Sequence, residues 1–251
     1  KLVTQPPVVW GGQTDKVQAD LGLTKEQVAG LTGGVNGSGV WVTQSMGGHV
    51  GLEVAHPDAT KWSRSVMVAD DGTMTVSNNV FFLRPMAQGS GFGTDVFAAQ
   101  VRGCVTAGAE KISTCAGRGQ YGREKMNGYY TWPRLGYNAP IPDHLRHKLP
   151  PGLRHAQDIL TLYETKEGRG WWKKHGETTT MTFDVSPGSK SVHVLNKYLA
   201  SHGKAPVTFP PDHAARVAAG KKVRASNRGA AKAVRQKWED RATKAGFEPR
   251  L

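Results

Sequence analysis

Apolar and polar residues alternate along four short segments in the first third of the chain, which is the pattern of half-buried β-strands. These segments are residues 40–43, 50–54, 65–69 and 73–76. The last two flank Asp70-Asp71-Gly72. Because a tight hairpin turn needs a positive φ, the Asp-Gly pair predicts a β-hairpin at this place. The second strand of the hairpin is expected to continue to Leu83.

Helical spacing replaces the alternation between residues 93 and 107. The apolar residues that share one face there are Phe97, Val101, Cys104 and Val105. Gly108 is a typical residue to end such a helix, and residues 111–116 form a short apolar strand candidate. A strand, a glycine-rich turn, a helix and a strand in this order predict a βαβ unit with two parallel strands.

Shorter patterns predict the other elements. We expect an extended segment at 1–10, a capped helix from Thr24 to Leu31, a flexible loop at 33–39, helices at 156–163, 189–201 and 227–245, and a strand at 178–185. Together the elements predict a mixed α/β (α+β) fold. Its central sheet is mostly antiparallel and flanked by helices, with a C-terminal strand–helix extension and a basic tail.

Composition and charge narrow the class of protein. The chain has 251 residues, 38% of them apolar, which is enough for one large domain or two small ones. The net charge of +13 is uneven: residues 1–100 carry −2, residues 101–200 carry +7 and residues 201–251 carry +8. No apolar run approaches the roughly 18 residues that span a bilayer, so we expect no membrane partner. No leader is visible, and the start at Lys1 is typical of a processed or trimmed chain.

The two cysteines, Cys104 and Cys115, are too few for a disulfide framework. They favour a reducing, cytoplasmic compartment, with a virion component as the alternative, and both are expected in the core. His144, His147 and His155 invite a metal site, but the flanking Arg and Lys favour a basic hydrated loop, so no metal is predicted.

The most specific motif is the hexapeptide Gln-Gly-Ser-Gly-Phe-Gly at residues 88–93, which lies between a predicted strand and the start of a predicted helix. The first amides of a helix have no internal partner, and the helix dipole places positive charge there. Glycines let the backbone approach an anion closely, so the motif predicts a phosphate or diphosphate cradle. It lacks the Lys of a nucleotidase loop and the G-x-G-x-x-G spacing of a dinucleotide fingerprint. The alternative is a glycine-rich turn without a ligand.

The pattern that fits is Gln-x-x-Gly-x-Gly, carried by Gln88, Gly91 and Gly93. It resembles the acyl-CoA pyrophosphate loop of the GNAT superfamily of N-acetyltransferases. The order strand, loop, long helix, strand is similar to that family, and residues 127–137 look like its segment that ends in Gly-aromatic. The resemblance covers about residues 40–140. Trp132 stands where the family's aromatic general acid is expected, and the strand before the loop carries no carboxylate.

The resemblance implies an acyl-CoA-dependent N-acyltransferase, with acetyl-CoA as cosubstrate and an unidentified amine acceptor. Residues 40–205 are then an acyltransferase-like domain, between an N-terminal extension (1–39) and a basic tail (206–251). Tyr129 or Tyr130 would protonate the departing thiolate, as suits a phenol with a pKa of ~10. The base candidates are Glu53, Asp70 and Asp71. The residues that would hold the cosubstrate are Phe82, Leu83, Gln88, Gly89, Ser90, Gly91, Phe92, Gly93 and Thr94.

A second hypothesis comes from the basic segment 211–251. Nine of the twelve Lys and Arg after residue 200 lie between Lys221 and Lys244. Such a segment attracts nucleic acid or another polyanion without sequence specificity, which would suit a non-enzymatic virion or assembly protein that reuses this fold. The alternative is a solvated tail. Two alternatives also remain for the segment Trp171-Trp172-Lys173-Lys174. Its tryptophans would either stack on nucleobases or pack on the 178–185 strand.

Overall fold

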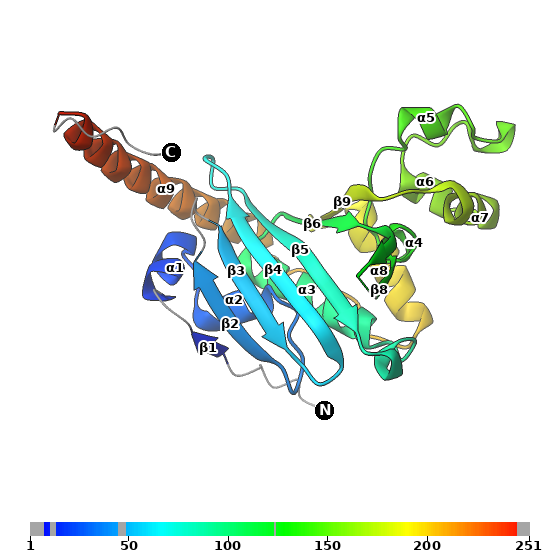
Figure 1. The fold of residues 1–251 in the computed structure, drawn as a ribbon, viewed down its shortest axis with the longest axis horizontal. Helices are drawn as coiled ribbons and strands as arrows, with labels where there is room; N and C mark the ends of the chain where they lie inside the picture. Colours follow the sequence, from blue (N-terminus) through cyan, green and yellow to red (C-terminus); the bar gives the residue numbers. More distant parts are fainter. Residues whose placement is uncertain (1–7, 11–13, 45–48, 123, 245–251) are drawn as a thin grey trace.

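Segments with alternating side chains meet in one β-sheet at the centre of the fold (Figure 1). The computed structural model describes residues 8–10, 14–44, 49–122 and 124–244. Seven strands within these residues follow one another across the sheet: β1 (Val8–Trp10), β2 (Gly39–Gln44), β3 (Val50–Ala55), β4 (Ala59–Val68), β5 (Met74–Leu83), β6 (Lys111–Ala116) and β9 (Thr179–Asp184).

Antiparallel neighbours dominate the sheet. Only the pairs β1–β2 and β5–β6 are parallel among the described strands. The predicted fold class, a mixed α/β fold with a mostly antiparallel central sheet flanked by helices, is confirmed. No element tests the predicted division at residues 39 and 205, so that division stays a prediction.

The β4–β5 hairpin turns where the Asp-Gly pair predicts it. Gly72 has a φ of 83°, which an L-residue adopts only with strain. Strand β5 reaches Leu83 as predicted, whereas β4 begins at Ala59, six residues before the predicted start at residue 65. Trp62, Val66 and Val76 point from this hairpin into the core.

Some helices cover one face of the sheet, and others lie beside its β9 edge (Figure 1). Figure 1 shows α2 and α3 behind β2–β5, whose other face is open in this view. The α-helices are α1 (Thr14–Leu21), α2 (Lys25–Gly30), α3 (Phe92–Ala107), α4 (Gly128–Arg134), α5 (Asp143–Arg146), α6 (Ile159–Tyr163), α7 (Lys166–His175), α8 (Lys190–Ser201) and α9 (His213–Lys244). Two 3-10 turns, η1 (Pro85–Ala87) and η2 (Pro151–Leu153), and a two-stranded hairpin, β7 (Arg118–Tyr121) with β8 (Glu124–Asn127), complete the described elements.

Strands β5 and β6 with helix α3 form the predicted βαβ unit. The two strands pair in parallel only from Thr75–Lys111 to Asn78–Thr114, although both continue beyond these residues. The β4–β5 ladder is also irregular here, because Asn79 lies between residues that pair with consecutive residues of β4. The end of β5 therefore separates from β6 on its way to η1 and α3.

An aromatic cluster joins α3 to the carboxyl-terminal elements. The ring of Phe97 on α3 lies 5.1 Å from Tyr137 and 5.2 Å from Phe183 on β9. All three side chains are buried. Beside them Asn78 donates to the Tyr137 hydroxyl and exchanges hydrogen bonds with Gln100, so these three polar side chains are paired.

Helix α9 begins at His213, so the predicted start at residue 227 was wrong. The early part of α9 packs on the β4–β5 turn. Arg224, 1% exposed, donates from Nε to Gly72 O (2.8 Å) and from Nη2 to Gly108 O (3.3 Å). Asp70 pairs with Arg228 and Lys232 in the same region. Figure 1 shows the later turns of α9 projecting away from the sheet.

One core prediction was wrong. Cys104 is buried on α3, but Cys115 is exposed on β6, where Ile112, Thr114 and Ala116 take the inward positions of the alternation. No helix within the described ranges is long and apolar enough to cross a membrane.

Candidate functional site

The glycine turn at residues 88–93 connects η1 to α3 at the end of β5. Gly89 and Gly91 have φ angles of 77° and 88°, so both occupy the left-handed region that other residues avoid. Helix α3 begins at the next residue, Phe92, and continues for 16 residues. The peptide groups of the turn therefore lie at the amino terminus of α3, which is the positive end of a long helix dipole.

Four amides of this turn are unpaired. Among the hydrogen bonds of the described residues, none uses the N–H groups of Gly89, Ser90, Gly91 or Gly93. Gly89 is exposed and would have open space around a Cβ. The Phe92 amide is different, because it donates to the Ser90 hydroxyl. The Thr94 amide is also used, since it donates to Gly91 O. The turn thus offers a set of adjacent donors suited to an anion.

Lys204, from the segment after α8, lies beside the turn. Its Nζ would be 3.8 Å from a Cβ at Gly91, and it forms an ion pair of 2.6 Å with Asp95 in the first turn of α3. The negative charge of Asp95 would repel an incoming anion, and the positive charge of Lys204 offsets the charge of Asp95. Lys204 and Asp95 are 109 residues apart in the chain, so no local pattern in the sequence connects them.

The predicted cofactor-binding side chains hold the turn in place. Gln88 donates from Nε2 to Leu83 O at 3.1 Å, which ties the turn to the end of β5. The Phe92 ring points inward and lies 4.7 Å from His56. Phe82 lies on the separating part of β5, with its ring 6.1 Å from Tyr121 of the β7–β8 hairpin. The structure therefore brings the predicted residues from Phe82 to Thr94 into one region.

The two predicted acids lie on α4, with their contacts toward other helices. Tyr129 donates its hydroxyl to Lys173 O at 2.8 Å, so its proton is engaged. The Tyr130 hydroxyl has no hydrogen bond among those of the described residues, and its ring lies 5.4 Å from Lys173 Nζ. Among the described residues, no hydrogen bond or ring contact joins either tyrosine to the glycine turn. Of the two, Tyr130 has the hydroxyl that is free to act.

The predicted bases lie elsewhere. Glu53 is exposed on β3, opposite Trp41 and Ser63, on the sheet face away from its buried neighbours Leu52 and Val54. No described contact joins Glu53 to the turn. Hydrogen bonds from Thr73, and then from Lys221, lower the pKa of Asp71 to about 2. Asp70 is paired with α9, so both aspartates hold the hairpin and helix together.

Comparisons with known proteins add no function. No protein-family model, curated protein or solved structure matches this chain. The described residues contain no group of three or more His, Cys, Asp or Glu that could hold a metal ion. His144 instead lies 3.0 Å from Glu177.

Eight of the nine basic residues between Lys221 and Lys244 divide into two groups; the side chain of the ninth, Arg235, lies outside the described part of the structure. Lys221, Arg224, Arg228 and Lys232 contact acids or carbonyls of the body of the protein. Lys222, Lys237, Arg241 and Lys244 are exposed, and none forms an ion pair with another described side chain. The structure leaves about half of the predicted polyanion-binding charges available. Trp172 is buried and donates from Nε1 to Tyr129 O, which makes it unavailable to stack on a base.

Proposed function

We propose that this protein is an acyl-CoA-dependent N-acyltransferase that transfers an acetyl group from acetyl-CoA to an amine. The observation that carries the proposal is the set of four unpaired amides at Gly89, Ser90, Gly91 and Gly93, at the start of α3. A diphosphate there would accept hydrogen bonds from these amides and would be favoured by the helix dipole and by Lys204. The resemblance of the turn to the GNAT loop supports an acyl-CoA over other diphosphates.

The separation of β5 from β6 supports the same proposal. Beyond Asn78 the backbone of β5 has no strand partner on the β6 side among the described pairs, so its free groups can bond an extended ligand; Phe82 O and Leu83 O already accept hydrogen bonds from Thr60 and Gln88. The pantetheine arm of acetyl-CoA is such a ligand. Its diphosphate would lie at the turn, and its thioester would lie along the free part of β5.

The reaction needs several proton transfers, the formation of a C–N bond and the cleavage of a C–S bond. The acceptor ammonium loses a proton, and its nitrogen attacks the thioester carbonyl carbon. The C–S bond then breaks, the nitrogen of the new amide loses its second proton to solvent, and the thiolate takes a proton. Tyr130 is the proposed donor of that proton, because its hydroxyl is not held by another group as that of Tyr129 is. The structure suggests no base, and solvent can take the first proton.

Calorimetric titration with acetyl-CoA tests the proposal. We expect saturable binding to the wild-type protein, and at least a tenfold weaker affinity in Lys204→Gln, because a hydrogen bond to a charged group contributes roughly 1.5–3 kcal/mol. Lys197→Gln, an exposed lysine on α8, is the matched control and should bind as the wild type does. Absence of binding by the wild type at millimolar acetyl-CoA would exclude the function.

The projecting part of α9 favours a second candidate function, binding of nucleic acid. The exposed Lys237, Arg241 and Lys244 lie there, beyond the residues that hold α9 to the hairpin. Electrostatic binding weakens steeply as salt rises. Removal of residues 233–251 should abolish salt-dependent DNA or RNA binding and leave acetyl-CoA binding unchanged. Equal nucleic-acid binding by the shortened chain would reject this candidate.

A further inference from the structure

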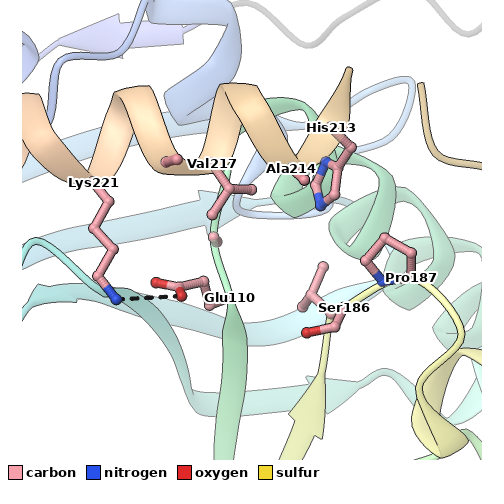
Figure 2. Close-up of a pocket in the computed structure, with 10 residues that line it drawn as sticks. Glu110, Ser186, Pro187, His213, Ala214, Val217 and Lys221 are labelled. Atoms are coloured by element: carbon pink, nitrogen blue, oxygen red, sulfur yellow. Dashed lines mark ion pairs between the residues drawn. The ribbon is translucent and has the colours of Figure 1, made fainter. Parts of the chain in front are cut away.

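Arg64 and Arg224 are buried in the core, each with 1% of its surface exposed. Burial lowers the pKa of Arg224, but the nearby charge of Glu110 counteracts that effect. Figure 2 shows Glu110 in a pocket of about 350 Å³ beneath the first turns of α9, where it pairs with Lys221 at 3.6 Å. Arg64, on β4, forms no ion pair with a described residue. A buried cation without a counter-ion is unusual, because nothing then offsets its loss of hydration.

The guanidinium of Arg64 uses one nitrogen for contacts with described residues and leaves two unused. Nη1 donates to Ser63 O at 3.0 Å and to Val80 O at 3.1 Å. Nε is buried without a partner, and Nη2 donates to no described residue. Nε and Nη2 form one edge of the planar group, and their N–H bonds on that edge are parallel. Because both donors belong to one rigid group, a single carboxylate can accept from both.

The described groups around Arg64 supply no negative charge. Burial lowers the pKa of Arg64 to about 10, so the side chain remains a cation at neutral pH. Tyr137 and Cys104 are the ionisable groups that act on it, and both are neutral because burial raises the pKa of each. The Trp62 ring centroid lies 5.7 Å from Arg64 Cζ, and Trp62 Nε1 is a second buried donor without a partner. Since the unsatisfied atoms are donors beside a positive charge, the partner that suits them is an anion.

The register of the sheet places Arg64 where β5 separates from β6. Arg64 lies opposite Asn78, which is the last residue of β5 in the described pairs with β6. The hydrogen bond to Val80 O directs the guanidinium toward the free part of β5, along which the thioester is proposed to lie. The Phe81 ring lies 5.3 Å from Arg64 Cζ, and its edge would be 3.7 Å from a Cβ at Gly93 in the glycine turn. Because Phe81 is only partly buried, the surroundings of Arg64 reach the surface beside the turn.

We propose that Arg64 binds the carboxylate of a small ligand through parallel hydrogen bonds from Nε and Nη2. A carboxylate has two acceptor oxygens in one plane, which match the spacing of these donors, and its charge complements the cation. In naming the ligand, this inference rests on the proposed function. The acetyl group ends in a methyl group and carries no charge, so the carboxylate belongs to the acceptor. The acceptor is then a small amine that also carries a carboxylate, as an amino acid does.

A titration with acetate tests the site without acetyl-CoA. Acetate supplies the carboxylate, and acetamide is its uncharged counterpart of the same shape. In nitrogen–proton NMR spectra of the full chain at constant ionic strength, the Nε–H signal of Arg64 should shift saturably with acetate and stay in place with acetamide. Concentrations up to about 100 mM suit so small a ligand.

Replacement of Arg64 by Lys keeps the charge but removes the pair of parallel donors. Arg64→Lys identifies the Nε–H signal by its absence, and it should weaken acetate binding at least tenfold, as followed by the amide signal of Phe81. Arg154→Lys is the matched control, because Arg154 is an exposed arginine that also donates to a main-chain carbonyl, Leu149 O. It should bind acetate as the wild type does.

A comparison of two acceptors tests the substrate class. Glycine carries a carboxylate where glycinamide carries an uncharged amide, and the amine of glycinamide loses its proton more easily. The wild type should nevertheless acetylate glycine with a kcat/KM at least tenfold above that for glycinamide, as measured by release of the CoA thiol. Arg64→Lys should lose that preference, and Arg154→Lys should keep it.

Circular dichroism melts show whether each variant remains folded, and the acetate titration of the wild type does not depend on the stability of a variant. Three results would overturn the proposal: an Arg64 Nε–H signal that acetate leaves unmoved, an equal shift with acetamide, or no preference of the wild type for glycine over glycinamide. Acetyl-CoA titrations of the same proteins report on the glycine turn. A wild type that binds acetate but not acetyl-CoA would refute the proposed function and leave the carboxylate site standing, and the reverse pattern would refute the carboxylate site alone.

Discussion

Replacement of Arg224 by Met tests how α9 is held to the sheet. The side chain is 1% exposed, and it donates to Gly72 O and Gly108 O, which lie in buried residues on two different loops. Met keeps most of the volume but donates no hydrogen bond, so both carbonyl oxygens lose the only donor recorded for them among the described residues. Each unsatisfied buried group costs about 1–3 kcal/mol, which gives an upper range of about 2–6 kcal/mol for the pair.

The measured loss should lie toward the lower part of that range. Burial of a guanidinium is itself costly, and Met does not bear that cost. Undocking of α9 would also let water reach both carbonyls. We therefore expect Arg224→Met to lower the free energy of unfolding in urea by about 2–4 kcal/mol. Hydrogen exchange should speed up over the first turns of α9 and at the β4–β5 turn.

Lys222→Met is the matched control, because Lys222 is the exposed neighbour on the same helix, two residues away. It should change stability by no more than about 0.5 kcal/mol. If the two variants unfold at the same urea concentration, with the same exchange rates in α9, the buried guanidinium does not hold the helix and the reasoning fails.

Three further predictions concern charge and proton donation. Asp95→Asn should raise acetyl-CoA affinity a few-fold in calorimetry, because it removes a negative charge beside the turn and frees Lys204; an unchanged or weaker affinity contradicts this electrostatic account. The pKa of Asp71 is lowered from 3.8 to about 2, so its stabilisation is present above pH 4 and lost as the pH falls through 2; Asp71→Asn should remove that part of the acid transition followed by circular dichroism, and an unaltered transition would exclude the contact. Tyr130→Phe should reduce kcat at least tenfold, whereas Tyr129→Phe should mainly lower the melting temperature; the reverse order in steady-state assays would reassign the acid.

Local signals in the sequence predict much of the sheet. The Asp-Gly pair predicts the turn at Gly72, and Thr24 with Gln27 forms the expected capping box of α2. The apolar face of residues 93–107 predicts α3 to within one residue at its start. These signals succeed because turn geometry, capping and periodic burial all depend on neighbouring residues.

The docking of α9 has no such signal. An Ala- and Lys-rich helix with few apolar residues is typical of a solvated tail, yet Arg224 holds it through main-chain carbonyls, which every residue carries. The position of Cys115 was, by contrast, available from the alternation of β6, where Ile112 and Thr114 already define the inward face.

The candidate site likewise has one part that the sequence predicts and another part that it does not. The glycine turn is visible in the sequence because its conformation and free amides follow from six consecutive residues. Lys204 reaches it from 109 residues beyond Asp95, and one pocket beneath α9 is lined by residues as far apart in the chain as Glu110 and His213. Contacts between such distant residues depend on the packing of whole elements, so no spacing rule finds them.

The most direct measurement is a nitrogen–proton NMR titration of the glycine turn. The account predicts that the amide signals of Gly89, Ser90, Gly91 and Gly93 shift together when acetyl-CoA is added, and that pantetheine, which has no diphosphate, leaves them in place. Signals that stay unmoved by acetyl-CoA, or that move equally with pantetheine, would show that the turn does not bind a diphosphate.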